Sequence, residues 1–97
     1  MAKEILTQDS RIRRSQRVLS NAIDTETVLL DISKSSYYGL DASASRIWEL
    51  LAQTVTVTQI IDILLKEYEV GKDECSRDVL AFLEELQTAG LIESINS

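Results

Sequence analysis

The sequence predicts an α+β domain in which a three-stranded antiparallel sheet is followed by three helices, in a winged helix-turn-helix-like arrangement. In the first half of the chain, short apolar stretches alternate like strands and are separated by short polar turns. In the second half, apolar residues recur at helical spacing through three segments. A chain of 97 residues has room for one such domain, in which helices packed on one face of the sheet bury the apolar side of both.

Three segments of the first half favour strands. Arg17–Asp24 is a weak strand, and Thr27–Ser33 is the clearest because its residues alternate between the two faces of a pleated backbone. Ser36–Leu40 is the third, with two tyrosines that favour a pleated surface. Since polar turns of a few residues join these segments, we expect an antiparallel meander. On the middle strand, one face carries Val28, Leu30 and Ile32, and the other carries Leu29 and Asp31.

The first helix is expected from Ala42 to about Gln53, almost directly after the third strand. Asp41 suits its N-cap, where a carboxylate accepts a hydrogen bond from a free N–H group of the first turn. One apolar stripe follows the helix at helical spacing and contains the only tryptophan of the chain. The stripe is Ala44, Ile47, Trp48 and Leu51.

Two more helices follow after a short link. Thr56 and Gln59 match a capping box, and the apolar residues behind them keep helical spacing. The third helix is expected over residues 74–89, with Asp73 as its N-cap and Gly90 at the C′ position. The second and third helices resemble a helix-turn-helix pair. The core stripe of the third helix is Val79, Phe82, Leu83 and Leu86.

The N-terminal segment differs from the rest of the chain in charge and periodicity. Residues 1–20 hold five basic and two acidic side chains, a net charge of +3, and the remaining residues carry −9, which gives the total of −6. Residues 1–10 show no apolar period. We therefore expect a flexible basic arm over residues 1–15, ahead of a folded domain over residues 16–97.

The composition removes most catalytic chemistry. There is no histidine, so Ser-His-Asp and Cys-His catalysis and the commonest metal ligand are absent. Cys75 is the only cysteine, which excludes an internal disulfide and makes a zinc site untenable. The three glycines form no phosphate-binding pattern, and the carboxylates show no spacing that singles out a catalytic pair. We expect a protein that is not an enzyme and holds no metal and no cofactor.

Two kinds of partner are disfavoured. No apolar run approaches the roughly 20 residues that span a bilayer, and the N-terminus lacks the apolar core of a secretion signal, so we expect a cytoplasmic protein with no membrane partner. The third helix would read DNA in a helix-turn-helix, but it carries five acidic residues against Arg77 alone, which disfavours nucleic acid. A small winged-helix regulator that binds DNA or a protein is the alternative of another class.

The favoured site is the edge of the predicted sheet. Ser36–Leu40 is expected at that edge, where unpaired N–H and C=O groups accept an extended peptide as an added strand. If the third helix packs beside the edge, the two enclose a cleft for alternate peptide side chains, and Asp78 would pair with a basic peptide residue. A plain core role is the competing interpretation of Leu40, Phe82 and Leu83. The expected peptide-binding residues are Ser36, Tyr37, Tyr38, Gly39, Leu40, Arg77, Asp78, Val79, Phe82 and Leu83.

The stretch from about Arg17 to Ile92 also resembles the PqqD-like family of peptide-recognition elements, which serve pathways of ribosomally made peptide natural products. The resemblance rests on VLLDISKSSYYGLDASASRIWELL, TVTQIIDILLKEYEV and DVLAFLEELQTAGLIE. It departs from the family at Asp41, where members often have asparagine, and in the turn at residues 34–36, where many carry a glycine. The residues that match the family pattern are Leu29, Leu30, Asp31, Tyr38, Leu40, Ala44, Ile47, Trp48, Leu50 and Leu51.

The resemblance implies a function and its partners. Such domains bind the leader segment of a precursor peptide as an added strand between the third strand and the third helix, and present it to a maturation enzyme. The small size and short basic arm are most similar to the leader-binding protein of split lasso-peptide systems, whose partner is a leader-cleaving cysteine protease. The alternative within the family is PqqD proper, which serves a radical-SAM enzyme in quinone-cofactor synthesis.

Overall fold

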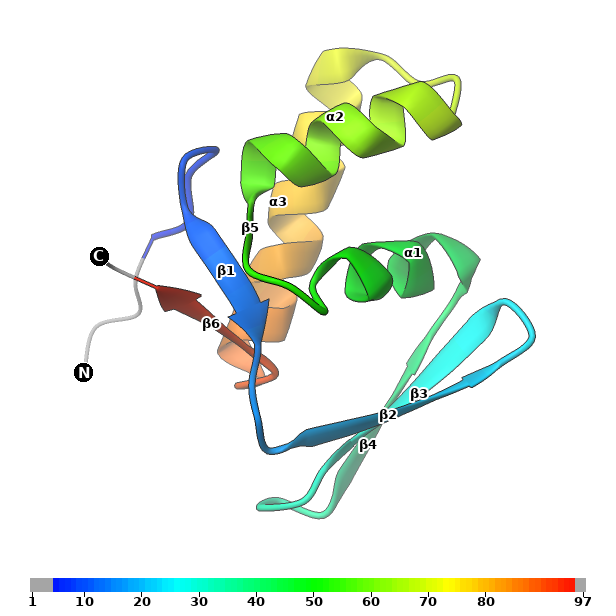
Figure 1. Cartoon of the computed structure of the whole chain (residues 1–97), viewed down its shortest axis with the longest axis vertical. Coiled ribbons are helices and arrows are strands. Elements are labelled where there is room, and N and C mark those ends of the chain that lie inside the picture. The colour runs from blue at the N-terminus through cyan, green and yellow to red at the C-terminus, as the bar shows by residue number, and fades with distance from the viewer. Residues whose placement is uncertain (1–4, 96–97) are drawn as a thin grey trace.

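The computed structural model describes residues 5–95 and has an α+β fold with antiparallel strands and three helices, as the sequence predicts (Figure 1). Among these residues, six strands form two three-stranded sheets, with the orders β5–β1–β6 and β2–β3–β4, so the prediction of a single sheet was wrong. In chain order the elements are β1 (Arg11–Arg14), β2 (Val18–Ile23), β3 (Glu26–Asp31), β4 (Ser36–Leu40), α1 (Ala42–Leu50), β5 (Val55–Thr56), α2 (Val57–Glu67), α3 (Lys72–Thr88) and β6 (Ile92–Ile95).

The β2–β3–β4 sheet is the predicted antiparallel meander. The register pairs Leu29 with Ser20 on one side and with Tyr38 on the other. One face of β3 is buried, whereas Val28 on the opposite face is exposed. Ser35 lies in the β3–β4 turn with φ of 52°, a left-handed conformation that glycine adopts without steric cost. The inward residues of β3 are Thr27, Leu29 and Asp31.

The β5–β1–β6 sheet was not predicted, and its strand β1 lies within the expected flexible arm. β1 is its central strand, and Ile12 is fully buried between partners at both edges. Leu6 is buried as well, while residues 1–4 lie outside the described part of the chain. The physical reason is that pairing on both sides satisfies the backbone of β1, and Ile12 fills the core in spite of the basic residues around it.

The helix ends follow the predicted capping chemistry with one exception. The Asp41 carboxylate accepts from the Ala44 N–H at 2.9 Å, and Thr56 and Gln59 form the predicted capping box. α3 ends in a Schellman motif around Gly90, which has φ of 77°. Its start differs from the prediction, because Gly71 is the N-cap and α3 begins at Lys72. The residue expected at this cap, Asp73, instead lies in the first turn, where its charge favours the helix dipole.

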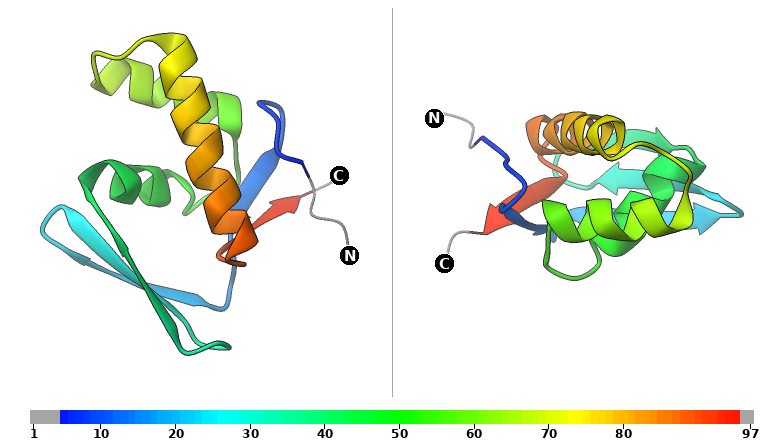
Figure 2. Two further views of the ribbon diagram at one scale, coloured as in Figure 1. Left: turned by 180° about the vertical axis from the view of Figure 1, so that it is seen from behind. Right: turned by 90° about the horizontal axis from the view of Figure 1, so that it is seen from above.

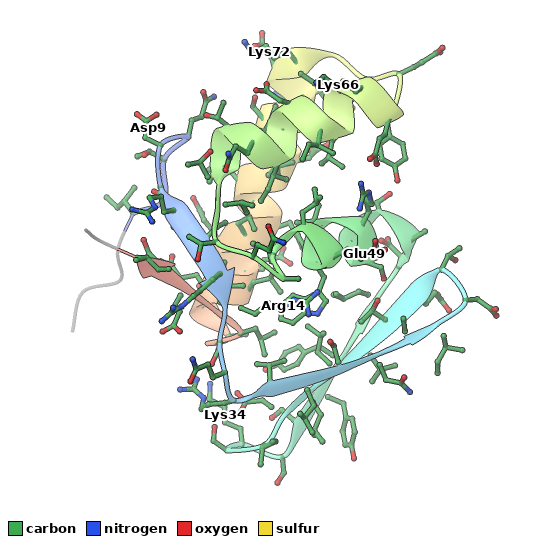
Figure 3. All side chains as sticks on the ribbon, viewed as in Figure 1. Asp9, Arg14, Lys34, Glu49, Lys66 and Lys72 are labelled. Carbon is green, nitrogen blue, oxygen red and sulfur yellow. The ribbon has the colours of Figure 1, made fainter. Side chains whose placement is uncertain are left out.

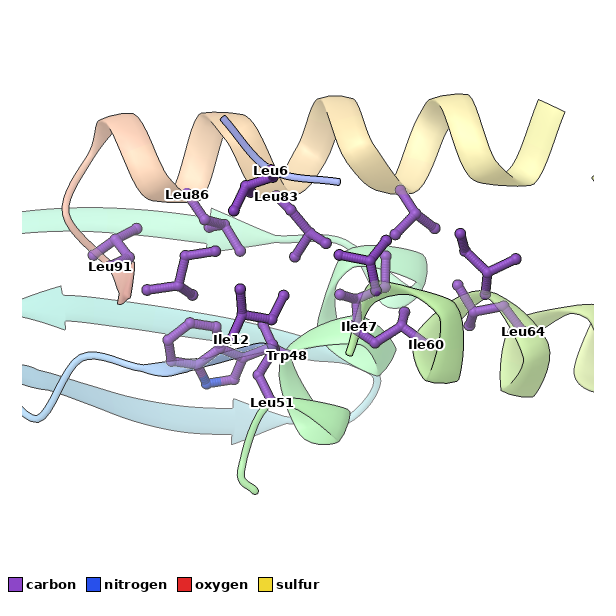
Figure 4. Close-up of a cluster of buried hydrophobic side chains, with 14 of the residues drawn as sticks. Leu6, Ile12, Ile47, Trp48, Leu51, Ile60, Leu64, Leu83, Leu86 and Leu91 are labelled. Carbon is purple, nitrogen blue, oxygen red and sulfur yellow. The ribbon is translucent and has the colours of Figure 1, made fainter. Parts of the chain in front are cut away.

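The core lies between the helices and the inner faces of both sheets (Figure 4). Trp48 is fully buried, and the Arg14 side chain reaches α1 from β1 (Figure 3). The Arg14 guanidinium lies 4.6 Å from the centroid of the tryptophan ring and donates to the Trp48 carbonyl at 2.5 and 3.1 Å. The core stripe of α3 differs from the predicted one at two positions, since Phe82 is only half-buried and Cys75 is buried. The buried residues of α3 are Cys75, Val79, Leu83 and Leu86.

Candidate functional site

The open edge of β4 is the first component of the site. Asp24 and Thr25 form a two-residue loop, so Ile23 and Glu26 are a hydrogen-bonded pair. From this pair onward, non-hydrogen-bonded and hydrogen-bonded pairs alternate along β2 and β3. The hydrogen bond from the Ile32 N–H to the Arg17 carbonyl, at 3.3 Å, agrees with this alternation. Even-numbered residues of β4 therefore bond to β3. The N–H and C=O groups of residues 37 and 39 point to the open edge, where a further strand can pair.

A cavity of about 590 Å³ separates this edge from α3. Seen from above, β4 is the strand of its sheet nearest to α3 (Figure 2). The floor comes from β4 and the start of α1, and the far wall comes from the second half of α3 and the residue after Gly90. The lining residues are Tyr37, Tyr38, Gly39, Leu40, Asp41, Ala44, Phe82, Glu85, Leu86, Ala89 and Leu91.

A second cavity of about 320 Å³ continues the first toward the N-terminal half of α3. It shares Asp41, Ala44 and Phe82 with the first cavity, so the two form one continuous depression, which we call the β4–α3 groove. Because alanine occupies position 44 on α1, there is space where the two cavities join. The remaining lining residues of the second cavity are Ser43, Ile47, Leu64, Tyr68, Val70, Glu74, Cys75, Asp78 and Val79.

The chemistry of the groove is apolar with an acidic rim. Its walls are mostly aliphatic and aromatic, and neither lining contains a lysine or an arginine. Four carboxylates belong to the linings. Burial raises the pKa of the Cys75 thiol, and the nearby Asp78 charge adds to this effect, so the thiol stays neutral and contributes apolar surface. The groove therefore suits an extended apolar segment that carries positive charge. The rim carboxylates are Asp41, Glu74, Asp78 and Glu85.

The structure brings together most of the predicted site residues. Tyr37, Tyr38, Gly39, Leu40 and Phe82 line the first cavity, and Asp78 and Val79 line the second with Phe82. Three predicted residues line neither cavity. Leu83 is fully buried in the core, Arg77 is exposed, and the half-buried Ser36 donates through its hydroxyl to the Lys34 carbonyl at 3.4 Å.

Several groove residues were not predicted as part of the site. Ala44 was assigned to the core stripe of α1, and its small size at the start of a helix was the available signal. Tyr68 and Val70 follow α2 and approach the groove only through the packing of α2 against α3, for which the sequence carries no direct signal.

Two kinds of site are missing from the part of the chain that the structure describes. No group of three or more histidine, cysteine, aspartate or glutamate residues within 5–95 is placed to hold a metal ion. No helix in the same range combines the length and the apolar character needed to cross a membrane.

Comparison with known proteins agrees with this architecture. The model of the family described as coenzyme PQQ synthesis protein D (PqqD) matches residues 26–92. The solved structure of TbiB1 in complex with the TbiA(beta) leader peptide is 38% identical; the match covers 88% of this chain and 99% of that chain, with a TM-score of 0.82. A lasso peptide synthetase B1 complexed with the leader peptide is 26% identical, with coverage of 84% and 96% and a TM-score of 0.76. No curated protein sequence matches the chain.

Proposed function

Since the chain belongs to the PqqD family, we propose that it is a non-catalytic protein that binds the leader segment of a ribosomally made precursor peptide and presents it to a maturation enzyme. The observation that carries the proposal is the groove between the unpaired edge of β4 and α3. It is supported by the similarity to two solved proteins that were each determined with a leader peptide.

The leader binds as an added strand along β4. Its main chain pairs with the N–H and C=O groups of Tyr37 and Gly39, which supplies affinity independent of sequence. Alternate leader side chains enter the two cavities, and Phe82 separates their positions. A basic leader residue near the second cavity pairs with Asp78 on the rim. In the winged helix-turn-helix-like arrangement, α3 thus serves as one wall of a peptide site.

The maturation enzyme that we favour is a leader-cleaving cysteine protease of a lasso-peptide pathway, because both similar solved proteins come with leader peptides and one is a lasso peptide synthetase B1. The second candidate is a PqqD-type chaperone that delivers a precursor peptide to a radical-SAM enzyme. The description of the matching family, coenzyme PQQ synthesis protein D, favours this candidate.

The test uses a substitution that fills the groove from a partly buried position of its lining. Val79 is unsuitable because it is buried. Ala44→Arg places a long side chain where the two cavities join, among the carboxylates that hold it there. Ala42→Arg is the matched control, since Ala42 is exposed on the same turn of α1 and carries the same charge penalty at the helix N-terminus.

The measurement is calorimetric titration with the leader of the precursor encoded nearest to this protein. We expect saturable one-to-one binding by the wild type and the control, and at least about tenfold weaker binding by Ala44→Arg, because lost pairing and apolar contacts cost more than 1.4 kcal/mol. Equal affinity of the two variants would place the peptide outside the groove. Absence of binding to that leader by the folded wild type would contradict the proposed function itself.

A further inference from the structure

The β2–β3–β4 sheet has a second open edge, on the side away from the groove. β2 has the sequence VLSNAI, with neither a charged residue nor a proline over its six residues. Natural edge strands are usually protected by charge, proline or a bulge, because unpaired N–H and C=O groups otherwise attract another strand. Within residues 5–95, β2 pairs only with β3. It lies farthest from α3 when the molecule is seen from above (Figure 2).

The outer face of the same sheet is apolar, and no segment within residues 5–95 covers it. Leu19 and Ile23 on β2 are 55% and 58% exposed, and they point to the face opposite the core. Neighbouring residues on β3 and β4 continue this face, and Tyr37 is the most exposed of them. An apolar surface of this extent beside an unprotected edge is characteristic of an interface. The exposed apolar residues of the face are Leu19, Ile23, Val28 and Tyr37 on the strands and Ile32 directly after β3.

Opposite charges lie at the two ends of β2. The turn after the strand carries Asp24, and Glu26 begins β3 directly beside it. Arg17 precedes the strand, and its guanidinium is fixed at that end by donation to the Gly90 carbonyl at 3.0 Å, with the Asp31 carboxylate of the same chain 4.0 Å away. Lys34 lies at the same end and donates to the Ala89 carbonyl. A strand with one acidic end and one basic end is complementary to an antiparallel copy of itself.

We propose that two copies of this chain pair antiparallel through β2 and form a twofold-symmetric dimer with a continuous six-stranded sheet. The alternation of hydrogen bonds leaves the N–H and C=O groups of Val18, Ser20 and Ala22 at the outer edge of β2. A twofold axis at Asn21 places Ser20 opposite Ala22 of the second copy in a hydrogen-bonded pair.

The same register matches side chains and charges. Leu19 lies opposite Ile23 of the second copy in a non-hydrogen-bonded pair, in which side chains approach most closely. Symmetry forms this apolar pair twice on the outer face. Arg17 comes opposite Thr25 of the second copy, one residue from Asp24, also twice. A register with the axis at Ser20 would instead set Leu19 opposite the polar Asn21 and Arg17 opposite Ile23, so the pattern selects the axis at Asn21.

The dimer does not compete with the β4–α3 groove. The strand order places the two β4 edges at opposite ends of the six-stranded sheet, so each copy keeps an open groove. The inference is therefore independent of the proposed function and is measured without a peptide.

The experiment is sedimentation velocity of the purified full chain over a wide range of protein concentration. We expect a concentration-dependent dimer of the wild type. Leu19→Lys is expected to weaken the dimer by about tenfold or more, because symmetry loses two apolar cross-strand pairs and adds two charges to the apolar face. Ile32→Lys is the control, since Ile32 is 57% exposed beside the same sheet but lies off the edge strand. Circular dichroism establishes that both variants are folded.

A second variant tests the register itself. Ile23→Glu alone is expected to weaken the dimer, whereas Leu19→Lys combined with Ile23→Glu places opposite charges across the interface and restores association. A monomer at all concentrations would overturn the proposal, as would equal weakening by Leu19→Lys and Ile32→Lys. A dimer that the double variant fails to restore would overturn the β2 register.

Discussion

The two sheets of the molecule share strand number and antiparallel pairing but differ in where their strands come from. The β5–β1–β6 sheet joins the N-terminal segment, the link before α2 and the C-terminal segment, and its central strand is paired on both sides. The β2–β3–β4 sheet joins neighbours in sequence, and its face opposite the core is apolar and exposed. The difference teaches that the first sheet ties segments distant in sequence to the core, while the second leaves an apolar face and the β4 edge beside the groove exposed.

The largest effect is expected when one kind of substitution is made in β1 and directly after β3. Ile12→Ala removes a side chain with no exposure from the core and is expected to lower the free energy of unfolding by about 2–5 kcal/mol. Ile32→Ala acts on a side chain that is 57% exposed and is expected to cost within about 0.5 kcal/mol. Urea unfolding followed by circular dichroism measures both.

A loss of this size approaches the total stability of a small domain. If Ile12→Ala does not fold, Ile12→Val is measured in its place. It removes one methylene and is expected to cost about 0.5–1.5 kcal/mol. Equal losses for Ile12→Ala and Ile32→Ala would contradict the contrast between the buried side chain of Ile12 and the exposed side chain of Ile32.

The sequence predicted the β2–β3–β4 sheet and missed the β5–β1–β6 sheet for a physical reason. β2, β3 and β4 pair with neighbours, so polar turns and alternation within about twenty residues are sufficient. β1 has one apolar residue among three arginines, and its partners lie about 40 and 80 residues further along the chain. Its strand character is thus a property of the tertiary fold.

The groove likewise has features that the sequence predicted and features that it missed. The predicted juxtaposition of β4 and α3 follows from burying one face of a sheet, and Leu40 and Phe82 line the cavity as expected. The contribution of Tyr68 depends on how α2 packs against α3 and on the course of the chain between them. No local pattern encodes that packing.

The next largest effect on stability is expected for the contact between Arg14 on β1 and Trp48 on α1. Arg14→Met removes the cation–π contact with Trp48 and the donation to its carbonyl, while it keeps the aliphatic stem. We expect a loss of about 1–2 kcal/mol, because the contact is partly buried and the donor is charged.

Arg13→Met is the matched control on the same strand. Its partner is Glu93 at 3.3 Å, in an exposed ion pair that is expected to contribute about 0.5 kcal/mol or less. Thermal unfolding of the two variants measures the difference. Equal losses would show that the attachment of β1 rests on its backbone pairing alone.

The smallest effect is expected at the β3–β4 turn and depends on pH. The Ser33 hydroxyl donates to the Asp31 carboxylate at 2.7 Å, and this bond holds the pKa of Asp31 below its usual range, with further help from the Ser33 N–H and from Arg17. A folded pKa below the unfolded value stabilises the protein above about pH 4, and this stabilisation is lost as the pH falls through the folded pKa. Ser33→Ala raises the folded pKa toward the unfolded one.

The variant is therefore expected to be slightly less stable than the wild type at neutral pH, and the difference is expected to shrink as the pH falls below about 4. Ser36→Ala supplies the contrast, because the Ser36 hydroxyl donates to a neutral carbonyl in the same turn and its loss is expected to be independent of pH. Urea midpoints across the acid range distinguish the two. A difference that stays constant with pH for Ser33→Ala would mean that the β3–β4 turn is stabilised by the shape of the loop, without a contribution from the charge on Asp31.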